Sequence, residues 1–492
     1  MQVDVIDDLK RLGEVKANWE ALYDADPETQ IFLSFYWINT WLTKIKDPWI
    51  VLAVKPSAKA SNYVAFLPLQ PKTEMKKEGG FYNDYKMGGA EFADYYGLLC
   101  HPDHEEAAIE ALAEHIKTLN WTNFKLEKFR ASDRRIHLFT KHFAKPKFAT
   151  KDVERFMNGG TINTQIFPYA KLPGDWETYL NNSLSSNTRQ KVKRFLKKAD
   201  EGSEFRVGHA DKDTFKRDLE TLLKYWSVKW AQEKGNKLAG IVQNNRIMMT
   251  ASFEENALIL PSFWKGDKAL AALAILLDRK KRAAHFFIGG RDETFNSPPP
   301  GFILHAHSIR WAIQNGFETY DFLMGNEPYK YMWGAEDRYV RTVILSTKSG
   351  ENLGGKLDKK CLPFVLDRVT ELNKQGKLTE AAIGLRQILD VDPRHAEALN
   401  LLAQLEAGRA HHLEAHKLYK AYVAERPEDH AAWFRMGKNA QALKDTDTAV
   451  QCYRKVIELD PTNREAPSLL IELQLKTSRA KPAQSPVSIL SR

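Results

Sequence analysis

The feature that most constrains this chain is a period of 34 residues in its C-terminal third. Three prolines recur at this spacing, each directly after a charged residue: Pro393, Pro427 and Pro461. Other residue types keep the same period: Ala381, Ala415, Ala449, Leu385, Tyr419 and Tyr453. A small residue where two helices touch, followed by a proline that ends the second helix, is typical of stacked helical pairs. The period therefore predicts an all-α solenoid over residues 362–480.

This pattern resembles the tetratricopeptide repeat. The third copy is the fullest, with the expected residue types at Trp433, Gly437, Ala449, Tyr453 and Pro461. The first copy lacks the Trp and the Gly, and we expect a half-repeat in residues 464–478. The resemblance implies a module that binds a protein partner in a concave groove. We expect the remaining residues, 481–492, to form a flexible tail.

Composition excludes several protein classes. A length of 492 residues suggests about three domains, and 43% hydrophobic with 27% charged residues indicates a packed globular protein. Three scattered cysteines exclude a disulfide scaffold, and without a Cys-x-x-Cys pair they predict no structural zinc. The first residues lack the apolar core of a signal peptide, and the longest apolar run, 269–277, is about half of a bilayer span. We therefore expect a cytoplasmic protein without a membrane span.

The net charge and the histidines limit the kinds of ligand that we expect. A net charge of +9 favours anionic ligands without by itself indicating nucleic acid. Neither histidine group has an evident third ligand, so we expect no metal: His305 and His307, and His411, His412 and His416. The sequence holds no Walker loop, no His-Glu-x-x-His motif and no Ser–His–Asp order.

Residues 1–350 show mixed helical and strand patterns. The first part predicts helices at 9–22, 35–45 and 105–119, and strands at 50–54, 63–69 and 124–129. A second unit begins near Thr161 with a strand at 165–172 and helices at 176–184, 186–199, 215–232 and 246–253. Strands at 258–264, 270–277 and 284–288 follow, then a helix at 302–315, a strand at 318–323, a short helix at 328–333 and a last strand at 339–345. This order predicts an α+β fold with one crossover.

Three stretches could carry chemistry. A strand ending at Gly289-Gly290 leads through a loop into a helix whose unpaired N–H groups would suit a pyrophosphate; the alternative is a proline-stiffened connector. The segment 320–333 gathers polar residues between a strand and a helix, where Asp321 could be catalytic or a satisfied structural carboxylate. The helix at 186–199 has a buried stripe of Val192, Leu196 and Ala199 and carries six cations and no acid over 185–198. That face suits an anionic partner or solvent.

Five segments resemble the acetyltransferase family found with bacterial cellulose and exopolysaccharide biosynthesis genes, which is similar to the Fem-type aminoacyltransferases. They are LSSNTRQKVKRFLKK (184–198), SPPPGFILH (297–305), YDFLMGNEPYKYMW (320–333), ADYYGLL (93–99), and the early Phe35-Tyr36-Trp37 with Trp41. The resemblance implies tandem GNAT-like domains at 1–160 and 161–350, of which the second carries the acyl-donor features.

The same resemblance implies a donor site. The strands at 284–288 and 318–323 would be the fourth and fifth GNAT strands, which splay apart and hold the pantetheine of acetyl-CoA. The cofactor-binding residues would be Arg291, Ser297, Gly301 and Phe302. The usual Arg/Gln-x-x-Gly-x-Gly/Ala loop is absent, and Pro298–Pro300 remove three backbone donors. Another acyl donor, such as an aminoacyl-tRNA, therefore stays open.

The catalytic roles follow from the same comparison. Transfer needs a base for the attacking amine or hydroxyl and an acid for the leaving thiolate. Asp321 is the candidate base with Glu327 in reserve, and Tyr329 or Tyr331 is the candidate acid. The candidate substrate-binding residues are Arg189, Lys193, Arg194 and Lys330, of which Lys330 could instead pair with Glu327.

The sequence thus predicts an acyltransferase, acting by N- or O-acetyl transfer in polysaccharide or cell-envelope biosynthesis, with a repeat module for a protein partner. The acceptor could be a sugar, an amino sugar or a peptide. One alternative is a non-catalytic GNAT-fold scaffold in a polysaccharide-export assembly, and another is a Fem-like transferase that uses aminoacyl-tRNA. An RNA-binding protein is a third and depends on the basic helix alone.

Overall fold

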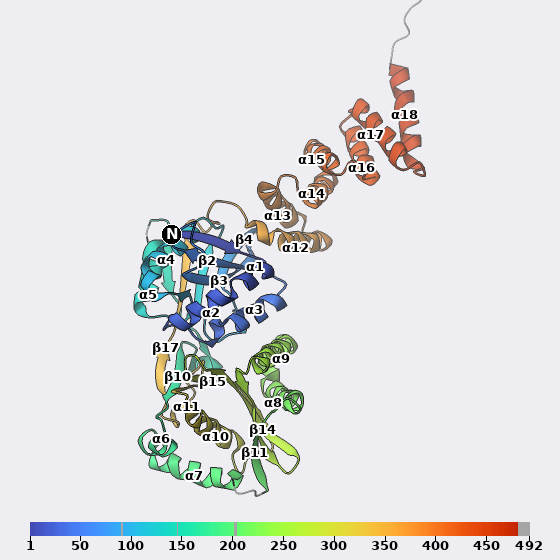
Figure 1. The fold of residues 1–492 in the computed structure, drawn as a ribbon. Coiled ribbons are helices and arrows are strands. Elements are labelled where there is room, and N and C mark those ends of the chain that lie inside the picture. The colour runs from blue at the N-terminus through green and yellow to red at the C-terminus, as the bar shows by residue number, and fades with distance from the viewer. Residues whose placement is uncertain (90–91, 145, 201–203, 481–492) are drawn as a thin grey trace, which may run out of the picture. The chain divides into compact units, whose positions relative to one another are not determined.

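The computed structural model describes residues 1–89, 92–144, 146–200 and 204–480 (Figure 1). The chain divides into two compact units, one formed by residues 1–72 and 84–350 and the other by 73–83 and 351–492. The expected flexible tail, 481–492, lies outside the described residues. The predicted fold class, mixed α and β followed by a helical repeat region, is confirmed.

The first half of the larger unit is built on a sheet that its own helices cover. The strands lie in the order β1 (Gln2–Ile6), β2 (Ile50–Lys55), β3 (Ala65–Met75), β4 (Phe81–Met87), β6 (Asn123–Phe129), β18 (Arg341–Thr347) and β7 (Phe148–Asp152), with β5 (Leu99–Cys100) paired to β3. The helices are α1 (Leu9–Glu14), α2 (Lys16–Ala25), α3 (Phe35–Lys44), α4 (Glu105–Ile116) and α5 (Asp133–Thr140). Trp19, Trp37 and Trp41, which keep the helical spacing read from the sequence, are at most 1% exposed.

The second half repeats this design. Its strands lie in the order β11 (Phe205–His209), β13 (Pro261–Lys265), β14 (Lys268–Asp278), β15 (Ala283–Arg291), β16 (Thr319–Asp321), β10 (Ile166–Lys171) and β17 (Glu336–Tyr339), with β12 (Leu258–Ile259) paired to β14. The helices are α6 (Trp176–Asn182), α7 (Ser186–Asp200), α8 (Phe215–Lys234), α9 (Leu238–Glu254), α10 (Pro300–Gln314) and α11 (Pro328–Tyr331). In Figure 1, α8 and α9 cover one face of this sheet and α10 the other.

The first sheet takes one strand from beyond the second half. β10 begins the second half in the chain and lies between β16 and β17 of the second sheet. β18 follows the second half and lies between β6 and β7 of the first sheet. The two strands occupy the same place in the two strand orders, and the first sheet is complete only with the chain segment that follows the second half.

The position of β18 corrects one part of the sequence analysis. The expected strand at 339–345 was assigned to the second unit, but its residues divide between β17, in the second sheet, and β18, in the first. Its alternating pattern predicted a strand correctly. Hydrophobic alternation carries no information about the partner strand, and two sheets of equal design offered equivalent positions.

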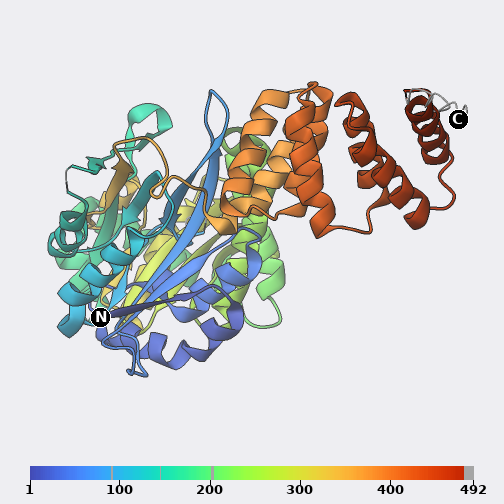
Figure 2. The ribbon, with the colours of Figure 1, turned by 90° about the horizontal axis from the view of Figure 1, so that it is seen from above.

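The repeats form antiparallel helix pairs that follow one another in chain order (Figure 2). The helices are α12 (Leu362–Lys374), α13 (Leu378–Val391), α14 (Ala396–Gly408), α15 (His412–Glu425), α16 (His430–Ala442), α17 (Thr446–Leu459) and α18 (Glu465–Ala480). The three periodic alanines are fully buried. Each second helix ends two residues before its periodic proline, as predicted.

The hairpin between β3 and β4 belongs to the repeat unit. The side chain of Gln387 on α13 accepts a hydrogen bond from the Phe81 amide at 2.8 Å and donates one to the Phe81 carbonyl at 2.9 Å. The Asn83 amide donates to the Asn352 side chain at 2.9 Å, and the Asn83 side chain accepts from the Asp358 amide at 2.7 Å. A side chain at Gly384 would meet the Phe81 ring at 2.6 Å. The hairpin therefore packs on the first helices of the repeats as part of their fold.

Candidate active site

The second sheet opens between two neighbouring strands. β15 and β16 run parallel and pair at only three positions, from Ala283 with Thr319 to His285 with Asp321. Beyond them β15 stays paired to β14 as far as Arg291, while β16 continues along β10. The edges of the two strands that face each other past this point have no strand partner among the described residues. The splay expected from the sequence is therefore present.

The corresponding opening in the first half is closed by the chain itself. β4 and β6 are also parallel and pair from Asp84 with Asn123 to Lys86 with Lys125. Past this point Tyr96 lies against β6: its amide donates to the Lys128 carbonyl at 3.1 Å, and its carbonyl accepts from the Arg130 amide at 2.8 Å. The other edge of β6 is paired to β18, so Tyr96 occupies the place that β4 has left. The chain therefore fills the opening of the first half, whereas no described strand fills that of the second half.

The backbone is irregular on both sides of this opening. In β15 the register against β14 shifts so that Phe287 has no opposite residue, which makes it a β-bulge. Bulges re-aim neighbouring peptide groups and are frequent beside active sites. Leu323, after β16, has a φ of 55°, and its amide is held by the Asp321 carboxylate at 2.8 Å. A leucine in this left-handed region is strained, so its surroundings must fix the turn.

The start of α10 leaves backbone donors free. Gly301 and Phe302 have no partner for their N–H groups within the described chain, whereas the Ile303 amide donates to the Pro299 carbonyl. A side chain added at Gly301 would meet nothing within 4 Å, so the space in front of this helix is open. Two free donors and open space suit a phosphate oxygen. The N-cap is Pro299, so Ser297 does not cap the helix.

Arg291, the remaining residue predicted to bind the acyl donor, pairs with a neighbouring carboxylate. The Arg291 guanidinium donates two hydrogen bonds to Glu293, at 2.7 and 3.1 Å. A carboxylate that already neutralises the guanidinium leaves little attraction for a pyrophosphate. The presence of glycine at position 290 has a structural explanation. A Cβ there would lie 2.8 Å from backbone atoms of α8. This glycine allows the helix to pack on the strand.

The basic helix α7 packs against α10. Its predicted buried stripe is confirmed, with Val192, Leu196 and Ala199 at most 9% exposed. Phe195 meets the Phe302 ring edge to face at 5.8 Å, which brings this helix next to the open start of α10. The candidate substrate-binding cations have the following contacts: Arg194 lies over the Phe195 ring, Lys193 pairs with Glu177 at 3.1 Å, and Arg189 donates to Asn181. The helix is a cationic face beside the helix start.

Asp321 is buried and fully engaged. Its carboxylate accepts from Tyr95 of the first half at 2.7 Å, from Arg338 at 2.7 Å and from the Leu323 amide at 2.8 Å. Burial raises its pKa, but the nearby His285 and the charges of Arg338 and Arg130 lower it by more, so the net pKa lies below the ordinary value. A carboxylate held in this way joins the two halves and is a poor proton acceptor. The geometry therefore favours the structural alternative.

The other polar residues of this segment form a small cluster. The Lys330 ammonium is 2% exposed and pairs with Glu327 at 2.9 Å. It also donates to the carbonyls of Met324 and Gly325, which shapes the loop after β16. Tyr331 donates to Asp337 at 2.7 Å, whereas the Tyr329 hydroxyl has no hydrogen-bond partner in the described chain. Of the two candidate acids, Tyr329 is the one that could still donate.

Asp94 is the carboxylate that the sequence analysis did not single out. It lies in the first half, close to Tyr95, and its nearest cation is Lys128 at 3.7 Å. Burial raises its pKa above the ordinary value, opposed by the charges of Lys128 and Lys330 and assisted by Asp321. The Asp94 carboxylate therefore shares its electrostatic surroundings with Lys128, Lys330 and Asp321. The only signal in the sequence was the segment 93–99, which entered as a resemblance and not as a site.

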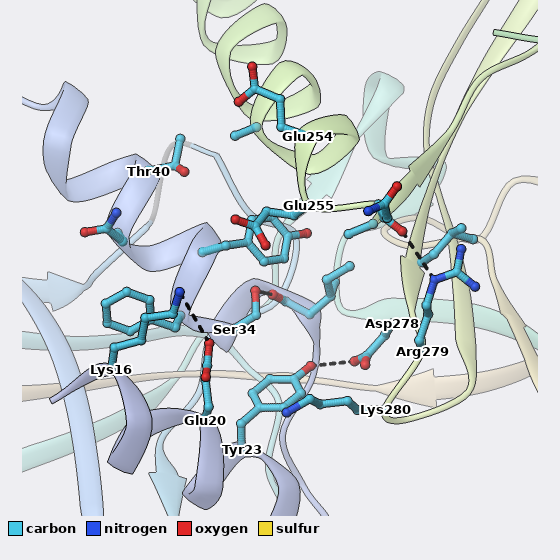
Figure 3. A pocket seen from close by; sticks show the side chains of 18 residues that line it. Lys16, Glu20, Tyr23, Ser34, Thr40, Glu254, Glu255, Asp278, Arg279 and Lys280 are labelled. Carbon is cyan, nitrogen blue, oxygen red and sulfur yellow. Dashed lines mark hydrogen bonds and ion pairs between the residues drawn. The ribbon is translucent and has the colours of Figure 1, made fainter. Parts of the chain in front are cut away.

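A pocket lies where α2 and α3 of the first half meet α9 and the end of β14 (Figure 3). Its volume is about 340 Å³, and charged side chains of both signs line it. The Tyr23 hydroxyl donates to Asp278 across the two halves at 2.5 Å, and Lys16 pairs with Glu20 at 3.9 Å. The lining mixes acids and bases with half-buried aromatic rings. It shows no nucleophile beside a base, so we assign it no chemistry.

Neither a metal cluster nor a membrane helix appears in the part of the chain that the structure describes. No group of three or more potential ligands gathers there, and none of its helices has the length and apolar character to cross a bilayer. The two histidines of α10 have separate surroundings, as expected. His305 packs among aromatic rings beside Tyr320, and His307 contacts His209 with 2.8 Å between their Nε2 atoms.

Comparisons with known proteins agree with this architecture. Residues 186–331 match the acetyltransferase (GNAT) domain family and residues 430–463 the tetratricopeptide repeat. A search of curated proteins finds no match.

Among solved structures, FemX is 13% identical over 70% of this chain and 97% of its own, with a TM-score of 0.47. A conserved protein of unknown function from Bacteroides thetaiotaomicron VPI-5482 is 10% identical over 70% and 100%, with a TM-score of 0.42. The first repeat domain of Spaghetti (RPAP3), bound to an HSP90 peptide, is 24% identical over 25% and 96%, with a TM-score of 0.23. The chain thus contains a GNAT-type acetyltransferase domain and, after it, a tetratricopeptide repeat.

Proposed function

We propose that the protein is an acyltransferase whose single donor site lies between β15 and β16. The observation that carries this proposal is the contrast between the halves: the same parallel strand pair is open in the second half and filled by Tyr96 in the first. One half would then bind the donor, and the other would support it and contribute to the acceptor side.

The residues around the opening fit an acyl-coenzyme A. The free amides of Gly301 and Phe302 would hold the pyrophosphate, and the cations of α7, next to Phe302, would attract its charge. The peptide groups re-aimed by the bulge at Phe287 would face the carbonyl of the acyl group. The bound thioester supplies an activated acyl group. We propose acetyl-CoA as the donor.

Asp94 is our proposed general base, in place of Asp321. A carboxylate with a raised pKa accepts a proton from an amine or hydroxyl more readily than one held low by an arginine. Tyr329 is the proposed acid: burial and Glu327 raise its pKa, so its hydroxyl stays protonated at neutral pH. As the acceptor attacks, Asp94 takes its proton, and Tyr329 returns one to the leaving sulfur. Lys330 positions the loop between them.

The test is the Asp94→Asn variant in an acetyl-transfer assay with the full chain. Loss of a general base lowers kcat by about 10²- to 10⁴-fold, and the acidic limb of the pH–rate profile should disappear. Asp213→Asn, an equal change at an exposed position, serves as the control. An Asp94→Asn enzyme with undiminished kcat would remove Asp94 from the mechanism while leaving the donor site untouched.

The acceptor is the second part of the proposal. The sequence resemblance of segments 184–198, 297–305 and 320–333 supports a sugar or amino sugar of a bacterial polysaccharide or cell envelope. A panel of amino sugars, neutral sugars and peptide amines, with acetyl-CoA as donor, separates the acceptor classes. Transfer to peptide amines alone would contradict the polysaccharide role.

The exposed cations of α7 keep a second donor open. An aminoacyl-tRNA would bind such a helix with a steep dependence on salt concentration. Transfer from aminoacyl-tRNA without transfer from acetyl-CoA would favour the Fem-like alternative. Binding of neither donor would favour a scaffold, in which the repeats recruit a protein partner and the GNAT domain is inactive.

A further inference from the structure

A second cavity lies between the two halves, at the closed end of the β15–β16 pair. Its volume is about 170 Å³, and it is lined by the loop after α2, the end of β6 and the first residues of β15 and β16. One water needs about 10–15 Å³ of such space, so the cavity could hold a group of several atoms. Pro27 and Lys281 on its rim are exposed or partly exposed, which gives access from solvent.

Buried polar atoms in this lining lack partners. The Gln30 side chain is 2% exposed; its oxygen accepts from the Phe32 amide at 2.7 Å, which leaves its NH₂ group without an acceptor. The Thr29 hydroxyl and both ring nitrogens of His285 are buried and unpartnered within the described chain. The nearest group to His285 is the Asp321 carboxylate, 3.7 Å from Nδ1. Unpaired buried polar groups are costly and usually mark a bound ligand or water.

The lining also carries an excess of positive charge. Three cations, Arg130, Lys281 and Arg338, face two carboxylates, Asp278 and Asp321. Arg338 is paired with Asp321, and Asp278 accepts from the Tyr23 hydroxyl. Lys281 donates to two backbone carbonyls.

Arg130 is the cation without a counterion. Within the described residues its guanidinium forms no ion pair and lies over the Tyr95 ring at 4.9 Å. Burial, and then the charge of Arg338, lower the pKa of Arg130. Arg130 is half-buried, and a guanidinium that is repelled by a neighbouring cation and has no paired carboxylate is stabilised by an anion.

We propose that this cavity binds a small oxyanion, a carboxylate or phosphoryl group, held by Arg130 together with the free donors of Thr29 and Gln30. The guanidinium fork matches two oxygens of such a group, and the hydroxyl and amide supply further donors. Since these residues come from both halves, the anion would bridge them. The site is separate from the donor opening, because β15 and β16 are paired at the cavity and part beyond it.

The test is a calorimetric titration of the full chain with inorganic phosphate and, separately, with malonate, which distinguishes phosphoryl from carboxylate ligands. Thr29→Val removes an unpartnered hydroxyl at nearly constant volume, so folding should be preserved. We expect it to weaken binding by about 3- to 10-fold, the effect of one neutral hydrogen bond. Arg130→Met should weaken binding by about 10-fold or more. Arg464→Met, an equal charge change in the repeats, is the control.

Two results would overturn the proposal. The first is the absence of binding by both anions at millimolar concentration. The second is binding that survives Thr29→Val and Arg130→Met and is lost in Gly301→Leu, since the anion would then occupy the donor site. Because the titration needs no acyl transfer, its failure and the failure of the proposed function are separate results.

Discussion

The Asp321→Asn variant tests how the two halves are held together. The substitution keeps the volume of the side chain and removes its charge. It weakens two charge-assisted hydrogen bonds, from Tyr95 and from Arg338, each worth about 1.5–3 kcal/mol. It also leaves the Arg338 guanidinium unpaired, but this side chain is 23% exposed and water can solvate it in part. We therefore expect a loss of about 3–5 kcal/mol in unfolding free energy, the range for a broken buried pair.

Urea unfolding followed by tryptophan fluorescence measures this loss in the larger unit, which contains Asp321. Trp433 is the only one of the 12 tryptophans beyond residue 350, so the signal reports mainly on the two halves of the larger unit. A double-mutant cycle with Tyr95→Phe isolates the bond between the halves. Its coupling energy should be about 1.5–3 kcal/mol.

The pH dependence gives an independent check. Because the folded pKa of Asp321 lies below the unfolded value of about 3.9, its contribution is complete above that pH and declines as the pH falls towards the folded pKa. The difference between wild type and Asp321→Asn should be constant from pH 6 to 8 and shrink below about pH 4. A loss below about 1 kcal/mol at pH 7, or a coupling energy near zero, would refute the structural role of this carboxylate.

Two further predictions concern other parts of the chain. Gly437→Ala places a Cβ 2.7 Å from the ring of Tyr453, which is fully buried, and should cost about 1–3 kcal/mol. Gly408→Ala is the control: its Cβ meets nothing within 4 Å, so it should be neutral or stabilising. We expect faster amide exchange in α17 for Gly437→Ala alone. Equal exchange in the two variants would contradict this prediction. Burial lowers the pKa of His209, and of His307 to about 3, so stability that is complete above about pH 6.5 falls as the pH drops. His307→Phe should flatten this slope between pH 6.5 and 4 in the fluorescence assay, and an unchanged slope would assign it to other groups.

The sequence predicted the structure best where a pattern repeats or where neighbouring residues alone determine the structure of a segment. The 34-residue period located each helix pair, because buried alanines and helix-ending prolines act within one repeat. The order of strands after Leu258 was also predictable, since neighbouring hydrophobic runs form a meander. The strands β1, β7 and β11, by contrast, were missed. Each has only five residues, several of them charged or half-buried, and such short runs cannot be told from loop or helix by pattern alone.

The return of β18 to the first sheet could not be predicted from the sequence. β10 and β18 have ordinary strand patterns, and what distinguishes them is the partner on each side. Pairing over such sequence separations depends on tertiary structure. The predicted boundary between the halves, near residue 160, stays a prediction; β18, which follows the second half, lies in the first sheet.

The candidate site was predicted in part. The opening between β15 and β16 followed from the resemblance to a known fold, and the free start of α10 followed from the strand–loop–helix pattern after Gly290. The roles of single residues did not follow, because they depend on neighbours that are distant in sequence. Tyr95 contacts Asp321 across 226 positions, and this contact decides the state of that carboxylate. Asp94 and the unpaired Arg130 depend on the same interface.

The central claim is a working donor site in the second half, and the most direct measurement is a calorimetric titration of the full chain with acetyl-CoA. Gly301→Leu adds a side chain at the start of α10, where a Cβ meets nothing within 4 Å, and Gly240→Leu makes the same change at a position on α9 where a Cβ is equally free. The account predicts that wild type and Gly240→Leu bind with equal affinity and that Gly301→Leu loses about 10-fold or more, which is at least 1.4 kcal/mol. No binding by the wild type, or equal binding by both variants, would contradict it.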